Sequence, residues 1–548
     1  MGDTLPANGA KKNSRLLGAT GIIMFATLLS RVTGFLRTML ISTVMKPKGY
    51  SDEFLLAFSL PDIAFNLLAG GAIAAALIPV MSSLLAKDRE EDAWKALSTF
   101  LNLSMAALVV LEIVFLFWTD GILALVAAGY ADAAANRGDR EMLVRLTRIL
   151  LLNVPFMMIA GQCNGILNSY RKFAAAAFGP VVYNLCTIVG IAVFGGIDVY
   201  LTAWMIVASA ALFFLLQLWS TRHEFRRYRP RLELRNPAFR RMIRQAVPSL
   251  ASSSIVEFNN IVARGFATFM EKGMITLLNN ANRTWQLPMG IFAQSIGIAM
   301  LPTLSAHHAA KETDAFRRLF NRGMRAVFLI SLPMAAILLV EGDQVMRLLF
   351  KWGHPADAEK DVFYGGVALM GYSAALLFAS LVGMTIRAFY AIHDSMTPLV
   401  SGLLGIAVNY GFNAAFHHYT HLGIAGTALA YTITSFFNMM FLLLVFGRRT
   451  GIRFFADNRR VFALSTLAVL PAGAVMWLLT RMLRPAVDSK LSQIVCVAVP
   501  ALACLVVFYL LSRAMHIREM EMIRDMVASR MGRFVKRGGG GASRRGGA

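Results

Sequence analysis

The stretch Leu29–Arg37 reads LSRVTGFLR and places two arginines, Arg31 and Arg37, inside a long apolar segment. A third arginine, Arg283, lies in the polar stretch Asn279–Gln286 (NNANRTWQ) of a later apolar segment. A guanidinium at the centre of a bilayer costs about 2.5–3.5 kcal/mol on insertion scales, so such residues usually face a protein interior or a water-filled cavity. These stretches therefore predict a membrane protein that binds an anionic group, such as a lipid phosphate, at membrane depth.

The composition supports an all-α, polytopic integral membrane protein. The 548 residues are 57% hydrophobic and only 16% charged, and the mean hydropathy is +0.58. The net charge of +23 would suggest nucleic-acid binding in a soluble protein, but the apolar segments leave no soluble domain for it. We therefore expect no nucleic-acid partner, and we attribute the positive charge to cytoplasmic loops that contact anionic membrane lipids.

Apolar stretches of about 20 residues, the length that spans a bilayer, predict fourteen transmembrane helices. Several contain Gly or Pro, and we expect broken or tilted helices around a cavity. The predicted spans are 16–44, 54–85, 96–118, 142–167, 173–194, 199–220, 246–269, 274–304, 323–341, 362–386, 396–416, 422–446, 461–480 and 491–512.

The distribution of Lys and Arg predicts the orientation and the domains. Basic residues concentrate in 221–245, in 447–460 and after Arg513, so these segments and both termini are expected on the cytoplasmic side. The predicted parts are an N-terminal segment 1–15, a six-helix lobe 16–220, a basic linker 221–245, a second six-helix lobe 246–446, two C-terminal helices 461–512 and a basic tail 513–548.

A weak internal repeat relates the two lobes. Leu60-Pro61 and Ile78-Pro79 resemble Leu287-Pro288 and Leu301-Pro302, with six helices between equivalent points. An even number of helices predicts two parallel repeats, related by an axis along the membrane normal, with the binding site between them. Chance similarity between apolar segments is the alternative.

Arg31 and Arg37 are candidate substrate-binding residues. They are six residues apart, so on a straight helix they point about 120° away from each other, although Gly34 between them permits a bend. Two guanidinium forks in one cavity can bind the oxygens of a diphosphate. The alternative for Arg37 is a side chain that reaches the membrane interface.

The eighth predicted helix adds Arg283, Asn282 and Gln286 to the candidates. Arg283 and Gln286 share one helix face, and Asn279 and Asn282 share another. Such a helix suits a hydrated pathway for a sugar phosphate, while hydrogen bonding between helices is the alternative for the amides.

Intramembrane acids are candidates for a gate or for ion coupling. Glu257 and Arg264 are seven residues apart on one helix face, which favours a structural ion pair, although Glu257 can also bind a coupling proton or sodium ion. Asp62 lies near a predicted helix start and is interpreted as a cap, and Glu112 is a further acid in the third helix.

The sequence predicts neither an enzyme nor a metal protein, and no cofactor is expected beyond a coupling ion of unknown identity. We find no catalytic triad, phosphate-binding loop or paired-carboxylate pattern. His417, His418 and His421 have no accompanying Cys, Asp or Glu and are interpreted as an outer turn. The four cysteines lie in apolar segments and are interpreted as buried small side chains.

The segment Ser30–Arg37 resembles the motif that opens the MurJ (MviN) lipid II flippases, a family of the multidrug/oligosaccharidyl-lipid/polysaccharide exporter superfamily. The stretch from Asp52 to Leu60-Pro61 and the eighth helix, Asn282 to Ser305, resemble further family motifs. The resemblance covers nearly the whole chain.

This resemblance implies two lobes that transport lipid II, the undecaprenyl-diphosphate-linked peptidoglycan precursor, outward across the bacterial inner membrane by alternating access. It implies that Arg31, Arg37 and Arg283 bind the diphosphate, that Asp52 lies near an outer gate, and that the last two helices form a groove for the polyprenyl tail. Cell-wall synthesis proteins are possible partners.

The chain departs from the family pattern at charged positions. Thr38 stands where an acid often follows the second arginine, and Phe65 and Asn66 stand where the second helix carries an arginine. Gly70 and Gln286 replace two further acids. These departures leave three alternatives open: a flippase for another polyprenyl-linked glycan, a drug/cation antiporter of the same superfamily, or a non-transporting cell-wall scaffold.

Overall fold

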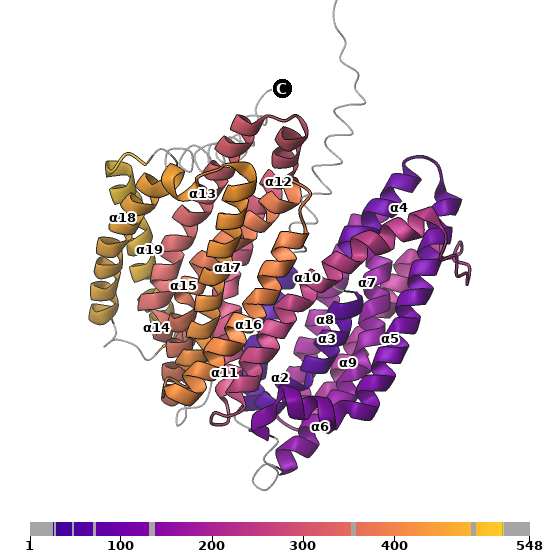
Figure 1. Ribbon diagram of the computed structural model, residues 1–548. Helices are drawn as coiled ribbons and strands as arrows, with labels where there is room; N and C mark the ends of the chain where they lie inside the picture. The colour runs from indigo at the N-terminus through magenta and orange to yellow at the C-terminus, as the bar shows by residue number, and fades with distance from the viewer. Residues whose placement is uncertain are drawn as a thin grey trace, which may run out of the picture. The chain divides into compact units, whose positions relative to one another are not determined.

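The computed structural model describes residues 29–46, 49–69, 73–130, 137–351, 358–483 and 489–517, together with Ala26 and Glu519. All regular secondary structure in these ranges is helical, which confirms the predicted all-α class (Figure 1). The predicted N-terminal segment 1–15, Gly70 and nearly all of the basic tail lie outside the described residues.

The first half of the chain begins with short helices and continues mostly with longer ones from α5 onward. Residues 29–40 are helical and continue into η1 (Ile41–Met45), α2 (Ser51–Ala57), α3 (Ser59–Leu68), η3 (Ile73–Leu77), α4 (Ile78–Leu85), α5 (Glu90–Val126), η4 (Ala128–Tyr130), α6 (Arg137–Leu151), α7 (Asn153–Ser169), α8 (Phe173–Phe194) and α9 (Val199–Phe225).

The second half contains mostly long helices. They are α10 (Pro237–Ala267), α11 (Met274–Pro288), η5 (Met289–Ala293), α12 (Gln294–Ala309), α13 (Thr313–Val340), α14 (Gly342–Phe350), α15 (Ala358–Ala391), α16 (Met396–Tyr419), α17 (Ile424–Thr450), α18 (Phe454–Leu483) and α19 (Lys490–Ala514).

Eleven helices among the described residues are long and apolar enough to cross a membrane. Each overlaps one predicted span, and Phe173–Phe194 has the predicted bounds. Three predicted helices are absent from this set for local reasons. The first begins in residues that are not described, and the second is divided into α2, α3, η3 and α4. The predicted span within α10 contains several Ser and Asn residues together with Glu257 and Arg264, which make it less apolar.

Three π-helical turns, η1, η3 and η5, interrupt the helices in the described ranges, and two of them adjoin a proline of these ranges, as expected for broken helices. η3 precedes Pro79, and η5 directly follows Pro288. Proline lacks the N–H group that continues an α-helical ladder, and π-turns are a common local adjustment. The helix that carries Arg283 is therefore divided between α11 and α12 by its own sequence.

The chain forms two compact units, each described here by itself. The first unit comprises residues 1–283, 349–364 and 398–434, and the second comprises residues 284–348, 365–397 and 435–548. In the first unit α7, α8 and α9 pack side by side (Figure 1), and α10 packs on α3 and α5. Trp94 belongs to the buried core of this unit and donates a hydrogen bond from Nε1 to Tyr170 Oη (2.8 Å). The predicted lobe boundaries stay a prediction.

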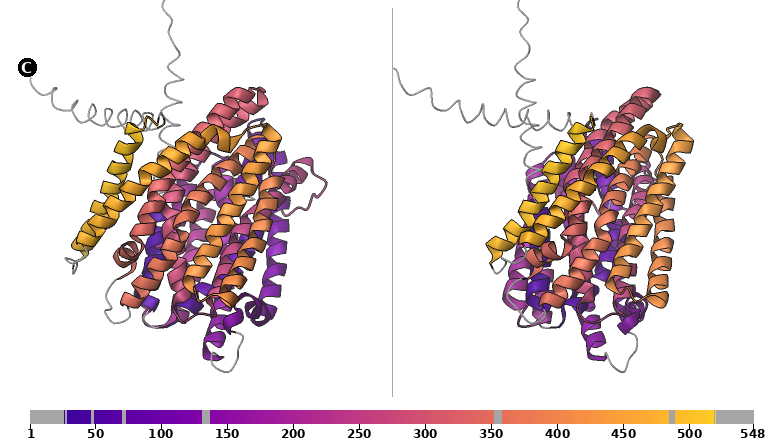
Figure 2. Two further views of the ribbon diagram at one scale, coloured as in Figure 1. Left: turned by 60° about the vertical axis from the view of Figure 1, so that its left-hand side comes forward. Right: turned by 90° about the vertical axis from the view of Figure 1, so that its left-hand side faces the viewer.

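The second unit has an aromatic core. Phe446 of α17 contacts Phe320 and Phe389, with ring centroids 4.7 and 5.1 Å apart. The α18–α19 pair runs side by side (Figure 2) and packs on α13. At the start of α18, Asp457 accepts two hydrogen bonds from Arg317 at 2.9 and 2.6 Å.

Asp52 holds the N-terminus of α11 within the first unit. Its carboxylate accepts hydrogen bonds from Gly273 N (2.6 Å) and Thr276 N (2.8 Å), and its side chain is buried. The first N–H groups of a helix have no partner within the helix, and a carboxylate there also interacts favourably with the helix dipole. Asp52 therefore caps a helix that is distant in the sequence.

We predict that Gly179→Val destabilises the first unit. A Cβ atom on Gly179 of α8 would lie 2.1 Å from Gln217 Nε2 and 2.2 Å from Phe213 Cε2 of α9. Overpacking of this kind costs about 1–3 kcal/mol, so thermal unfolding in detergent should begin at a lower temperature. Gly411→Val is the matched control, because nothing lies within 4 Å of its Cβ position. Equal unfolding temperatures for the two variants would contradict the described packing.

We predict that Asp52→Ala lowers the free energy of unfolding by about 0.5–2 kcal/mol, the usual effect of losing a helix cap. Thermal denaturation of the purified protein measures this change. Asp120→Ala removes an exposed acid that binds Arg140 at 2.8 Å, and an exposed ion pair contributes about 0–1 kcal/mol. A larger loss for Asp120→Ala than for Asp52→Ala would contradict the capping role.

Candidate substrate cavity

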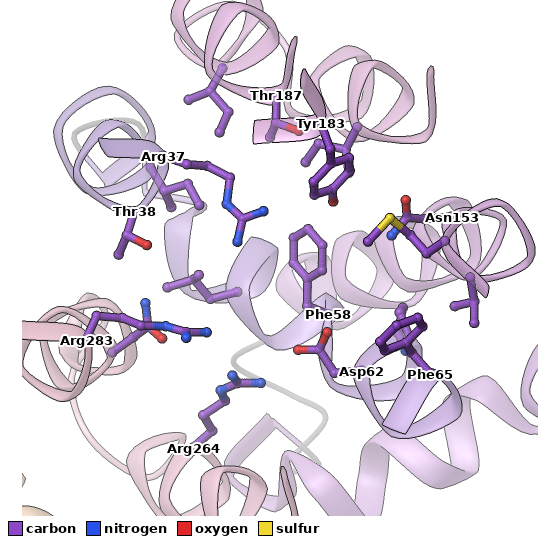
Figure 3. A pocket seen from close by; sticks show the side chains of 18 residues that line it. Arg37, Thr38, Phe58, Asp62, Phe65, Asn153, Tyr183, Thr187, Arg264 and Arg283 are labelled. Carbon is purple, nitrogen blue, oxygen red and sulfur yellow. The ribbon is translucent and has the colours of Figure 1, made fainter. Parts of the chain in front are cut away.

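A cavity of about 250 Å³ in the first unit gathers three arginines from separate helices. Arg37 comes from the first helix, Arg264 from α10 and Arg283 from α11, and Figure 3 shows all three directed inward. The other polar lining residues are Thr38, Asp62, Asn153, Tyr183, Thr187 and Asn279. Apolar side chains complete the wall: Ile41, Leu55, Phe58, Pro61, Phe65, Val154, Met157, Ile191 and Ile206.

The Arg37 guanidinium lies beside the ring of Tyr183 (Figure 3), 5.8 Å from its centroid. The face of an aromatic ring attracts a cation, and it does so without using the hydrogen-bond donors of the guanidinium. Arg37 is half-buried. The cavity interpretation of this residue therefore fits the structure better than a side chain that reaches the membrane interface.

The side chain of Arg283, in the middle of α11, has a solvent-accessible surface. Since its side chain points into the cavity (Figure 3), part of its accessible surface is cavity surface. Asn279, one turn earlier on α11, also lines the cavity. Asn280 faces elsewhere and donates to Ser42 Oγ (2.8 Å), which ties α11 to the first helix.

Arg264 forms the ion pair that its spacing from Glu257 predicted. Its Nη1 atom lies 3.5 Å from Glu257 Oε1 and 3.4 Å from Ser59 Oγ. Both side chains of the pair are nearly buried, with 11% and 12% exposed. The sequence did not indicate that Arg264 would also line the cavity.

Asp62 has a different position from the one predicted. It lies in the first turn of α3, as a cap would, but its carboxylate lines the cavity near Arg264 (Figure 3). It is the only carboxylate among the described lining residues, beside three guanidiniums. The cavity is therefore cationic and suited to a phosphate group.

Five predicted site residues do not line this cavity, and one of them is Glu257, the ion-pair partner of Arg264. Arg31 is exposed, one and two-thirds turns before Arg37, and Asp52 is buried at the start of α11. Asn282 donates to Asn260 Oδ1 (3.5 Å), and Gln286 belongs to the second unit. The structure thus brings together Arg37, Arg264 and Arg283 from the predicted set.

Sequence reasoning missed the lining residues of α7 and α8. Asn153, Tyr183 and Thr187 stand in otherwise apolar helices. A single polar residue in such a helix gives no spacing pattern, so no local signal distinguishes these residues from ordinary helix-packing positions.

The histidine cluster and the cysteines lie apart from the cavity lining. His417 packs on Phe269, with ring centroids 4.9 Å apart, and the described residues contain no group of three His, Cys, Asp or Glu side chains that could hold a metal ion. All four cysteines are free. Cys163, Cys496 and Cys504 are buried as predicted, whereas Cys186 is only partly buried.

Comparison with known proteins gives consistent matches. The family model described as lipid II flippase MurJ matches residues 41–496. The lipid II flippase MurJ of Burkholderia cenocepacia is 29% identical over 433 residues, which cover 77% of this chain and 82% of that protein. A probable lipid II flippase MurJ of Vibrio cholerae is 25% identical over 499 residues, which cover 86% and 90%.

Solved structures show the same fold. A lipid II flippase MurJ in an inward closed conformation superposes with a TM-score of 0.69 at 19% identity, covering 90% of this chain and 99% of that one. An inward-facing multidrug resistance MATE family transporter gives a TM-score of 0.62 at 17% identity, covering 77% and 94%. Because the family model matches most of the length, this chain belongs to the lipid II flippase MurJ family.

Proposed function

We propose that this protein is a flippase that moves lipid II from the inner to the outer leaflet of the bacterial inner membrane by alternating access. The observation that carries the proposal is the convergence of three guanidiniums from three helices on one cavity of the first unit. Cations in such a place are costly unless an anion or a protein group compensates them. The names of the related proteins supply the cargo, and the cationic lining disfavours a carrier of cationic drugs.

In this proposal Arg37 and Arg283 bind the diphosphate of the substrate. A guanidinium fork pairs with two phosphate oxygens at once, which orients the headgroup as well as holding it. Arg31, Asn282 and Gln286 contact the headgroup at other stages of its passage. Asn279 supports Arg283 from the same helix and the same cavity wall.

Asp52 and the Glu257–Arg264 pair are proposed to act in gating or coupling. Asp52 holds the start of α11, so any movement of that helix changes the Asp52 hydrogen bonds. The membrane potential provides a driving force for returning an empty cationic carrier, about 2.3 kcal/mol per charge per 100 mV. We propose no specific coupling ion.

The proposed surroundings follow from the charge distribution. Arg226, Arg227, Arg229, Arg231 and Lys95 outnumber Glu90 and Glu91 in a hollow of about 480 Å³ after α9. We propose that this region is cytoplasmic and contacts anionic lipids. Both termini are proposed to be cytoplasmic. The weakly charged α18–α19 pair is proposed to bind the polyprenyl tail, and contacts with cell-wall synthesis proteins remain a further proposal.

We predict that Arg37→Ala and Arg283→Ala abolish the ability of the gene to support growth of a bacterium depleted of its own lipid II flippase. Each variant removes a phosphate ligand whose charge-assisted hydrogen bonds contribute about 1.5–3 kcal/mol. The direct measurement is the amount of lipid II in the outer leaflet, and it should fall at least about tenfold.

Arg140→Ala is the matched control. It removes an arginine that is paired with Asp120 outside the cavity, and it should support normal growth. Membrane levels of each variant are measured in parallel. Normal delivery of lipid II by both cavity variants would overturn the assigned roles, and failure of the wild-type chain to complement would overturn the function itself.

A further inference from the structure

We propose that Arg264 is the residue that selects a diphosphate-linked lipid over a monophosphate-linked one, as a third phosphate-binding guanidinium. This inference rests on the proposed function, because it concerns the same cavity. It assigns to Arg264 a role beyond its ion pair with Glu257, and it identifies the feature of the headgroup that the cavity recognises.

The position of Arg264 is unusual for an arginine near a helix end. It lies in the last turn of α10, where a basic side chain normally extends to solvent and interacts with the helix dipole. Here only 11% of the side chain is exposed, and the guanidinium is directed into the cavity (Figure 3). Its surroundings are therefore the cavity and not bulk solvent.

The contacts of Arg264 leave most of its donors available. Among the described residues, both Glu257 and Ser59 are met by the Nη1 atom alone, at 3.5 and 3.4 Å. These distances are long for hydrogen bonds to a charged group, which are typically 2.7–2.9 Å. A guanidinium has five N–H donors in a planar fork, so Nε and Nη2 remain for a ligand in the cavity.

Asp62 and Glu257 offset part of the positive charge of the three arginines without occupying most of their hydrogen-bond donors. Asp62 lines the cavity together with three arginines, but no ion pair of this carboxylate is found in the described part of the chain. The Asp62 carboxylate and the guanidiniums still attract each other without a direct ion pair, because the protein interior has a low dielectric constant. The two acids therefore reduce repulsion among the arginines while leaving their donors free to bind phosphate.

The chemistry of the headgroup explains why a third guanidinium is useful. A diphosphate diester has two negative charges and four non-bridging oxygens, whereas a monophosphate diester has one charge and two such oxygens. Two guanidinium forks donate four hydrogen bonds. Four anionic oxygens can together accept more than four, because each oxygen has more than one lone pair. A third fork therefore adds more to the binding of the diphosphate than to that of the monophosphate.

The test compares two lipids that carry the same saccharide on the same polyprenyl chain, one linked through a diphosphate and one through a monophosphate. Binding to the purified full-length protein in nanodiscs is measured by native mass spectrometry. Arg264→Gln should weaken binding of the diphosphate lipid about tenfold, as expected for one lost charge-assisted contact. Binding of the monophosphate lipid should change by less than about threefold.

Relocating the guanidinium provides a positive test. Phe65 of α3 lines the same cavity (Figure 3), so Phe65→Arg in the Arg264→Gln background should restore part of the diphosphate preference. Arg244→Gln is the matched control, because Arg244 is an exposed arginine of the same helix outside the cavity lining. This control should leave the preference of the wild-type protein unchanged.

The outcomes separate the inference from the proposed function. If the wild-type protein does not bind the diphosphate lipid, the proposed function fails. If it binds both lipids equally, or if Arg264→Gln keeps the wild-type preference, only this inference fails. Should Arg264→Gln not fold because Glu257 loses its partner, Arg264→Gln/Glu257→Gln removes the whole pair and carries the same expectation and the same contradicting result.

Discussion

The energetic cost of placing guanidinium groups at membrane depth is the constraint on which the site depends. Arg37, Arg264 and Arg283 come from three helices, yet they share one cavity, whose described lining includes a single carboxylate. Each would be expensive in contact with lipid. Their convergence gives the first unit a cationic cavity in addition to its packed apolar core.

The arrangement of α11 shows how backbone chemistry supports this site. Asp52 binds the free N–H groups at the start of the helix, and Pro288 ends it at a π-turn. Backbone groups in a membrane protein must be satisfied internally because lipid offers no hydrogen bonds. The cap and the π-turn thus define a short helical segment whose middle presents Asn279 and Arg283 to the cavity.

The fold by itself does not identify the cargo. A MATE transporter superposes nearly as well as a lipid II flippase, with TM-scores of 0.62 and 0.69. Function is therefore argued from the cavity. The loss of a cation at Phe65 relative to the family pattern suggested a weakened site, but Arg264 places a guanidinium in the cavity that Phe65 lines. The cationic character is retained through a different helix.

The sequence alone determined the helical membrane class, eleven of the fourteen span positions and the Glu257–Arg264 pair, because hydropathy and helical periodicity are local properties. It also identified Arg37 and Arg283, since charge in an apolar segment is conspicuous. Only the tertiary structure showed that Asp62 and Arg264 line the cavity, that Asp52 caps α11, and that Asn153 and Tyr183 belong to the site. These facts depend on which faces of distant helices meet, and packing between helices decides that.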